Sequence, residues 1–559
     1  MPWRRLALAF WLLAASLDAE QVRITVLATT DLHGNLYPVD YFTGRPAPRG
    51  LAKLSTLIRE QRAANPNHLL LDCGDTIQGT PLEYVYQTWV HAGHFPLNLS
   101  FAGRLPGDPM MQAMNQLGYD AMALGNHEFN FGLKNLERAR AEARFPWLSA
   151  NTRGGEKPFP RYLLRTVAGI KVAVIGVTTP AVPTWEKAGN LGGYRFLPPR
   201  QAVEETLAEL RAERPALVVI AAYAGRGGAV DKSGENPMDE VARSVPGIDA
   251  IVLGHTHQSL PQAFVNGVLL AQPKNWGMSL ARLDFVLESL AGGWKVVEKS
   301  GRLIPVADAT PADPEILALA KPYHDLTERY LNTEVARSAA ELDAKLGRVE
   351  DTALVDAVHQ VQLHYAQADV SFTALFNPRV RVPRGPVTVR QIAALYLYEN
   401  ELYAIEGDGQ MVKEALENAA RYFLSCRDAA CAGPLINSAV FGFNYEMAQG
   451  VEYEIDLTRP EGDRVRNLRW RGRPLDPRRK LRIAINNYRA GGSAGYSMFR
   501  DARVVWRSPE DIRQLIIQYY SQRGSLPAQP DGNWRIVPEA ARRTLAQQAL
   551  ADAERASAF

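Results

Sequence analysis

The stretch QVRITVLATTDLHG, residues 21–34, joins a strand-like run to an Asp-Leu-His motif. Val22, Ile24 and Val26 alternate with polar residues before Asp31, and this alternation predicts a β-strand. Four further apolar runs also end in polar motifs, and the full set is Asp31-Leu32-His33, Gly74-Asp75, Gly125-Asn126-His127-Glu128, Tyr223-Ala224-Gly225 and Gly254-His255-Thr256-His257. Ligands of α/β sheets bind beyond the carboxyl ends of the strands. We therefore expect the five motifs to converge on one site.

The residue types in these motifs match a site for two divalent cations. Asp75 is ionised at neutral pH and offers two oxygens, so it can bridge two ions. The other ligand candidates are two pairs spaced two residues apart and one amide oxygen: Asp31 with His33, His255 with His257, and Asn126. Mixed imidazole and carboxylate ligands suit Mn, Zn, Co or Fe better than Ca or Mg. Two such ions about 3.5–4 Å apart activate a hydroxide and clamp a phosphate, which predicts hydrolysis of a phosphate ester.

Each motif alone has a plainer structural explanation. An Asp or His after a strand often caps a turn or helix, and either His of Gly254-His255-Thr256-His257 could be a core imidazole. The ordered set of motifs favours the phosphoesterase interpretation.

The chain resembles the 5′-nucleotidase and 2′,3′-cyclic-nucleotide phosphodiesterase family of secreted two-domain enzymes, from about Gln21 to about Asp531. The segments TTDLHGNLYPVDY, residues 29–41, and GNHEFNFG, residues 125–132, resemble its bacterial cyclic-phosphodiesterase branch. The 5′-nucleotidase branch usually has Asp where this chain has Asn130. The resemblance implies an α/β protein with a calcineurin-like metallophosphoesterase β-sandwich flanked by helices. A C-terminal α/β nucleotide-recognition domain would follow.

The resemblance also implies which residues hold two divalent ions. One ion would be held by Asp31, His33, Asp75 and His257, and the other by Asp75, Asn126 and His255. His127 would lie near the leaving group, where it stabilises charge or protonates the departing oxygen. Asn130 would orient His127 without supplying the charge of the Asp in the other branch.

Tyr223 departs from the family pattern, which has a metal-ligating His at this position. Neutral tyrosine is a poor ligand, since its ordinary pKa of about 10 keeps it protonated. Three outcomes are open: a loosely held second metal, a phenolate ligand with a different metal preference, or a weakened hydrolase. The alternative is that the loop is shifted and another group serves as the ligand.

The resemblance places nucleotide recognition in the second domain. Two segments, 443–445 and 486–492, correspond to those that sandwich the base between aromatic rings. The implied substrate-binding residues are Asn444, Tyr445, Tyr488, Arg379 and Arg381. Packing is the alternative role for these tyrosines.

The chain divides into five regions. Residues 1–19 are expected to form a signal peptide, since Arg4 and Arg5 precede a short apolar core; an anchoring helix is the alternative. Residues 20–305 should form the metallophosphoesterase domain, 306–345 a helical linker, 346–531 the recognition domain and 532–559 a terminal helix and tail. Cys426 and Cys431 could form a local disulfide in an oxidising compartment. We expect an exported protein, periplasmic or extracellular.

Composition excludes some partners. The formal net charge is +3 over 559 residues, with no long run of like charge, so nothing favours a nucleic-acid polymer. No later run is long enough to span a membrane, and no protein partner is implied. The expected partner is a small nucleotide, and the expected activity is a 2′,3′-cyclic-nucleotide phosphodiesterase with 3′-nucleotidase activity. Two alternatives stay open: a 5′-nucleotidase or nucleotide-sugar hydrolase, and a nucleotide-binding descendant impaired at the second metal by Tyr223.

Overall fold

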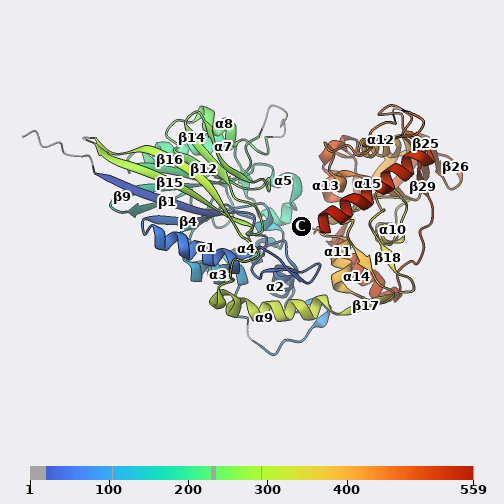
Figure 1. Cartoon of the computed structure of the whole chain (residues 1–559), viewed down its shortest axis with the longest axis horizontal. Helices are drawn as coiled ribbons and strands as arrows, with labels where there is room; N and C mark the ends of the chain where they lie inside the picture. Colours follow the sequence, from blue (N-terminus) through green and yellow to red (C-terminus); the bar gives the residue numbers. More distant parts are fainter. Residues whose placement is uncertain are drawn as a thin grey trace, which may run out of the picture.

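Two α/β domains are joined by the long helix α9 (Pro314–Leu331) in the computed structural model (Figure 1). The structure describes residues 20–557 other than 104, 228–233, 291, 399 and 427. The expected signal peptide, residues 1–19, lies outside the described residues. Asp313 caps α9 by accepting a hydrogen bond from the backbone N–H of Glu315, and Pro314 occupies the first helical position, where its missing N–H costs nothing.

The first domain contains two six-stranded sheets. The first sheet has the order β16 (Gly293–Pro305), β15 (Ser279–Leu290), β1 (Gln21–Thr29), β4 (His68–Asp72), β5 (Ala121–Ala123), β6 (Trp147–Leu148). The second has the order β13 (Leu260–Val265), β14 (Val268–Gln272), β12 (Ala250–Leu253), β11 (Leu217–Tyr223), β9 (Ile170–Thr178), β8 (Tyr162–Val167). Strands β1, β4 and β5 are parallel neighbours, as are β11 and β12. The five motifs therefore follow the carboxyl ends of parallel strands.

The two sheets pack face to face between layers of helices. Alternate residues of β1, including Ile24 and Val26, share one apolar cluster with Val172 and Val219 of the second sheet. The opposite face of β1 packs Leu27 under α1 (Leu51–Ala64) and α3 (Pro109–Leu117). Helices α7 (Pro199–Leu210) and α8 (Met238–Ser244) cover the second sheet. The helix-flanked sandwich expected from the sequence is confirmed.

The second domain has a five-stranded and a four-stranded sheet. The larger has the order β23 (Glu446–Gln449), β19 (Val370–Ala374), β27 (Lys480–Asn486), β22 (Glu401–Asp408), β28 (Val504–Asp511). The smaller has the order β26 (Arg473–Pro474), β25 (Val465–Trp470), β24 (Glu452–Asp456), β29 (Trp534–Val537). Its longer helices are α10 (Ala353–Ala366), α12 (Gly409–Ala420), α14 (Ile512–Arg523) and α15 (Glu539–Ser557).

Shorter elements connect these layers. In the first domain they are β2 (Val39–Asp40), β3 (Arg45–Pro46), α2 (Pro81–Ala92), η1 (Pro96–Asn98), η2 (His127–Phe129), α4 (Gly132–Glu142), β7 (Thr152–Arg153), α5 (Val182–Trp185), α6 (Ala188–Leu191) and β10 (Arg195–Phe196). In the second they are β17 (Glu334–Ser338), β18 (Leu342–Asp343), β20 (Arg381–Val382), β21 (Gly385–Thr388), α11 (Val389–Leu395), η3 (Gly442–Asn444), α13 (Asn487–Ala490), η4 (Ser493–Gly495) and η5 (Ser497–Phe499).

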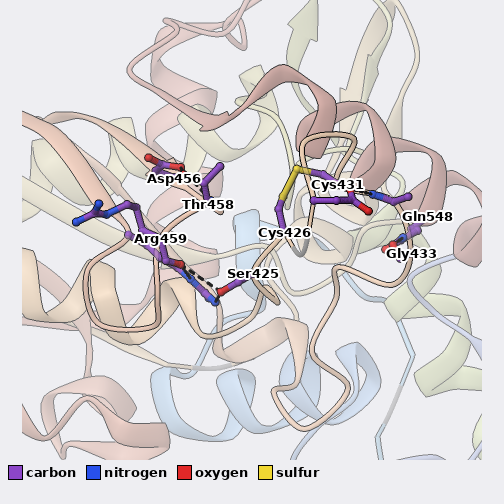
Figure 2. The surroundings of a disulfide bond; sticks show 11 residues. Ser425, Cys426, Cys431, Gly433, Asp456, Thr458, Arg459 and Gln548 are labelled. Atoms are coloured by element: carbon purple, nitrogen blue, oxygen red, sulfur yellow. Dashed lines mark hydrogen bonds between the residues drawn. A yellow bond between two sulfur atoms is a disulfide. The ribbon is translucent and has the colours of Figure 1, made fainter.

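The expected disulfide is present between Cys426 and Cys431 (Figure 2). Its loop is fastened to α15, because the Gln548 side chain donates to the Gly433 carbonyl at 2.7 Å. Cys73 is a buried free thiol in the first domain. Burial raises the pKa of the Cys73 thiol well above its ordinary value, so it stays protonated.

The two domains share apolar contacts. Leu82 and Val85 of α2 and Tyr323 of α9 belong to the same buried cluster as the core of the second domain. Arg390 of α11 pairs with Glu328 of α9 at 2.8 Å. Within the described part of the chain, no helix is both long and apolar enough to cross a bilayer.

Candidate active site

Three side chains from the first and last motifs meet at one point. His33 Nε2 lies 3.1 Å from His257 Nε2, and His257 Nε2 lies 3.4 Å from Asp31 Oδ1. Asp75 Oδ2 is 3.7 Å from His33 Nε2. Zinc–nitrogen bonds of about 2.0–2.1 Å put adjacent ligands of one ion about 3.0–3.4 Å apart. These donor atoms therefore have the spacing of ligands around a single cation.

The protonation of His33 suits a metal ligand. Its Nδ1 lies 3.0 Å from the carbonyl oxygen of Gln78. This oxygen can only accept a hydrogen bond, which favours a proton on Nδ1 and leaves Nε2 facing the cluster. Burial, with the neighbouring His257 and His127, lowers the pKa of His33 to about 3. The imidazole is thus neutral and has a lone pair at Nε2.

Five of the predicted ligands have left-handed backbone conformations. The φ angles are 49° at Asp31, 47° at His33, 58° at Asp75, 69° at His255 and 52° at His257. Such angles are uncommon for residues other than glycine, and each costs on the order of 1–3 kcal/mol unless the surroundings impose it. Backbone strain is therefore concentrated at residues that the sequence analysis expects to hold the ions.

Glu128 holds two motif loops together, a role that sequence reasoning missed. Its buried carboxylate accepts hydrogen bonds from the backbone N–H groups of Asp75 at 3.0 Å, Thr76 at 2.6 Å and Gly125 at 2.7 Å. A Cβ at Gly125 would lie 2.3 Å from Asp75 Oδ1, so this close approach requires glycine. The only sequence signal was the place of Glu128 in its motif.

Asn126 presents an unsatisfied oxygen to the site. It is buried, and its Oδ1 has no hydrogen-bond partner among the described residues. Buried polar atoms are nearly always paired, so this oxygen fits an open position for a cation. Asn126 is one of the three residues expected to hold the second ion.

Tyr223 lies among the ligands expected for that second ion. Its hydroxyl donates a hydrogen bond to Asp75 Oδ2 and lies 3.0 Å from His255 Nδ1. The other ring nitrogen of His255 lies 2.7 Å from Glu235. Burial, followed by the charge of Asp75, raises the pKa of Tyr223 well above 10. The loop is therefore not shifted away, and a neutral phenol joins two of the expected ligands.

His127 lies beside the first cluster. Its Nδ1 is 2.5 Å from Asn130 Oδ1, and its Nε2 is 3.8 Å from Asp75 Oδ2. The turn η2 spans residues 127–129, so the two side chains are brought to the same side. This position agrees with the expected role near a leaving group.

The aromatic residues of the second domain differ in exposure. Tyr445 is 0% exposed and packs against Tyr422 and Phe423, so its ring belongs to the core and is not offered to a base. Phe443 is 39% exposed and Tyr488 is 42% exposed. Phe443 stacks on the exposed ring of Phe441, with 5.2 Å between centroids. Phe443 and Tyr488, here called the aromatic pair, are thus the exposed rings of the two predicted segments, and Phe443 replaces Tyr445 in this role.

Buried Arg489 holds these two segments together. It pairs with Glu446 at 2.6 Å and donates to the Phe443 carbonyl at 2.8 Å and to Asn444 Oδ1 at 3.0 Å. Its guanidinium lies 5.2 Å from the Tyr488 ring. Asn444 therefore lies at the aromatic pair, where the sequence analysis expected it.

The two predicted arginines, Arg379 and Arg381, lie at the protein surface. Arg381 forms an exposed ion pair with Glu341, and Arg379 is exposed in the loop before β20. Besides Arg489, Arg348 also lies beside η3, with its guanidinium against Gly442. Arg348 carried no sequence motif that would have identified it.

Comparison with known proteins agrees with this site. The family model for calcineurin-like phosphoesterases matches residues 24–259, and the model for the 5′-nucleotidase C-terminal domain matches residues 331–501. The 2′,3′-cyclic-nucleotide 2′-phosphodiesterase/3′-nucleotidase of Salmonella typhimurium is 30% identical over 94% of this chain and 91% of its own length. The chain belongs to the 5′-nucleotidase family of metallophosphoesterases. It is accordingly a hydrolytic enzyme of a class that uses divalent metal ions.

Two further proteins are similar to this 5′-nucleotidase-family chain along most of its length. The trifunctional nucleotide phosphoesterase YfkN of Bacillus subtilis is 29% identical over 93% of this chain, which spans 39% of the length of that protein. The crystal structure of a 5′-nucleotidase precursor from Thermus thermophilus shares the fold, with a TM-score of 0.65 and 24% identity over 93% of this chain and 100% of that one.

Proposed function

We propose that this nucleotide phosphohydrolase opens 2′,3′-cyclic nucleotides and removes the resulting 3′-phosphate. The observation that carries the proposal is the contact of Asn130 with His127. Asn at this position resembles the cyclic-phosphodiesterase branch, whereas the 5′-nucleotidase branch usually has Asp. The name of the Salmonella relative supports the same activity.

The residues of the first domain divide the chemistry among them. Divalent ions, when bound by the Asp31, His33, Asp75 and His257 cluster, supply an activated water and neutralise phosphate charge. His127 directs Nε2 toward the same region and exchanges a proton with the leaving oxygen. Glu128 holds the loops of Asp75 and His127 next to each other through hydrogen bonds from their backbone N–H groups.

The second domain supplies recognition of the base. Phe443 and Tyr488 offer exposed rings, and stacking contributes about 1–3 kcal/mol per base whatever its identity. Figure 1 shows α13, which contains Tyr488, on the side of the second domain that faces α5 of the first. The Asn487 side chain donates to the Trp185 carbonyl at 3.5 Å across this junction. A nucleotide held by Tyr488 would thus extend its phosphate toward the metal ligands.

We also propose that the protein is exported. The charged and apolar pattern of residues 1–19 supports export. The disulfide between Cys426 and Cys431 supports an oxidising compartment. Cell fractionation and thiol labelling test this proposal. We expect processed protein outside the cytoplasm, with a Cys426 that does not react with the label. Full-length protein in the cytoplasm would contradict the proposal.

A substrate panel tests the activity. We expect purified protein with added Mn²⁺ to hydrolyse 2′,3′-cyclic AMP and 3′-AMP with higher kcat/KM than 5′-AMP or UDP-glucose. Preference for 5′-AMP or UDP-glucose would instead identify a 5′-nucleotidase or nucleotide-sugar hydrolase.

Tyr223 favours a second candidate function, nucleotide binding with little hydrolysis. A phenol between Asp75 and His255 removes an imidazole ligand from the second site. In that case calorimetry would detect tight binding of 3′-AMP, while turnover would stay low at every concentration of added Mn²⁺.

A further inference from the structure

Glu186 lies where three functional parts of the molecule meet. It follows α5, and no motif drew attention to it. The ring of its neighbour Trp185 contacts the ring of His255 at 5.5 Å between centroids. Its other neighbour, Lys187, forms an ion pair with Glu401 of the second domain. The segment is therefore held from both domains beside the metal ligands.

The Glu186 carboxylate is linked to His127 through one amide. His127 Nδ1 lies 2.5 Å from Asn130 Oδ1, and Asn130 Nδ2 donates to Glu186 Oε2 at 2.6 Å. The second oxygen of Glu186 accepts from Asn190 Nδ2 at 2.9 Å and from the backbone N–H of Lys187 at 2.7 Å. Both carboxylate oxygens are thus held by donors.

The chemistry of these groups fixes their order. An ionised carboxylate only accepts hydrogen bonds, so Asn130 must turn its NH₂ group toward Glu186. Its carbonyl oxygen then faces His127, and an oxygen acceptor requires a proton on Nδ1. Nε2 is left as the nitrogen directed at the metal cluster. Without the carboxylate, the amide could rotate by half a turn and present its NH₂ to Nδ1, which would select the opposite tautomer.

We propose that Glu186 is a positioning residue that acts through Asn130 to fix the tautomer and orientation of His127. The effect on turnover rests on the proposed function, because it assumes that His127 serves the leaving oxygen. In the branch that has Asp in place of Asn130, a carboxylate would contact the His directly. In this protein the Glu186 carboxylate is separated from His127 by the amide of Asn130. Asn130 and Glu186 together therefore orient His127, as that Asp would.

A double-mutant cycle tests the proposal. Glu186→Gln can donate as well as accept, so it should lower kcat for 3′-AMP by about fivefold or more, with KM within about twofold. The loss should be smaller for p-nitrophenyl phosphate, whose leaving group needs less protonation. In an Asn130→Asp background the same substitution should have no effect or should raise kcat, because the introduced carboxylate contacts His127 directly. An equal loss in both backgrounds would show that Glu186 only supports the Asn190 and Lys187 turn, and would overturn the proposal.

The matched control is Glu240→Gln, which removes an exposed carboxylate from α8. It should leave kcat and KM unchanged. If the Glu240 variant lost as much activity as the Glu186 variant, net charge rather than position would explain the effect, and the proposal would be wrong.

The tautomer can be measured without activity. In metal-free protein labelled with ¹⁵N-histidine, the His127 signals are identified by their absence in His127→Gln. We expect the Nδ1–H form in the original protein and a mixture of tautomers in Glu186→Gln. An Nε2–H form in the original protein, or the same tautomer in both, would overturn the inference. If the original protein hydrolysed no nucleotide, the proposed function would fail, while this measurement would still decide the role of Glu186.

Discussion

The hydroxyl of Tyr223 donates a hydrogen bond to the carboxylate of Asp75. Asp75 is expected to bridge two ions, so a proton held on one of its oxygens competes with a cation for that oxygen. The same hydroxyl lies 3.0 Å from His255 Nδ1, the ring nitrogen that faces it. The Tyr223 hydroxyl thus contacts two of the three residues expected at the second ion.

Replacing this phenol should change the metal content. The original protein should contain fewer than two ions per chain and gain activity with added Mn²⁺ or Co²⁺. Tyr223→His supplies an imidazole ligand, so it should raise the content toward two ions and reduce the dependence on added metal. Elemental analysis of purified protein measures the stoichiometry.

Tyr223→Phe is the control for this substitution. It removes the competing proton without adding a ligand, so its metal content should stay below that of the His variant. Two tightly held ions in the original protein, with no change in the His variant, would show that Tyr223 is a competent ligand.

Removing a ligand of the first cluster should abolish hydrolysis. Asp75→Ala or His257→Ala leaves a cation under-coordinated, and the lost charge stabilisation of several kcal/mol corresponds to about 10²- to 10⁴-fold in kcat/KM. Circular dichroism should show folded protein in both cases. His91→Ala, a change at an exposed position on α2, should keep full activity; an active Asp75 variant would refute the metal assignment.

The exposed aromatic pair should affect nucleotides selectively. Phe443→Ala and Tyr488→Ala should each raise KM for 3′-AMP by about 5- to 150-fold, the equivalent of about 1–3 kcal/mol of stacking. Hydrolysis of p-nitrophenyl phosphate should change little, because it has no base. Phe264→Ala, at an exposed ring on β13, is the control. Equal losses on both substrates would assign Phe443 and Tyr488 to packing.

The sequence predicted the candidate metal ligands of the first domain better than the candidate base-stacking residues of the second. The strands before Asp31, Asp75 and His257 were predictable because apolar runs of strand length have a strong periodic signal, and parallel strands bring their carboxyl ends to one edge. The roles of Tyr445 and Phe443 were not distinguishable. Phe443 lies within the turn η3 and Tyr445 directly follows it, so one ring faces the surface and the other enters the core. No local residue pattern reports that direction.

Glu186 and Glu235 show a second limit. Glu186 contacts Asn130 across 56 positions of the chain, and Glu235 contacts His255 across 20. Both lie in loops, and a single carboxylate in a loop is usually a solvated group. Only the tertiary packing identifies their partners.

A buried histidine in the second domain should make stability depend on pH. Burial lowers the pKa of His359 in α10 to about 3, whereas an unfolded histidine has a pKa near 6.5. Between these values the unfolded state binds a proton that the folded state does not. The contribution of neutral His359 to the free energy of unfolding is therefore fully present above about pH 6.5. It decreases as the pH falls toward 3, by up to about 1.4 kcal/mol per pH unit.

Calorimetry at pH 7.5 and pH 5 measures this effect. The decrease in Tm of the second domain should be smaller in His359→Leu, which cannot take up a proton. His364→Leu, at an exposed position near the end of the same helix, should retain the original decrease. The same decrease in the His359 variant would mean that another group controls acid sensitivity.

Stability and the predicted metal site make opposite demands at five positions with left-handed backbone. These positions are Asp31, His33, Asp75, His255 and His257. Glycine would adopt each of these conformations without the cost of about 1–2 kcal/mol that a side chain carries there. Glycine at any one of these positions would therefore relieve backbone strain and remove a predicted donor atom at the same time. The five side chains supply donor atoms that glycine lacks, so the fold carries this backbone cost at the positions where the sequence predicts metal ligands.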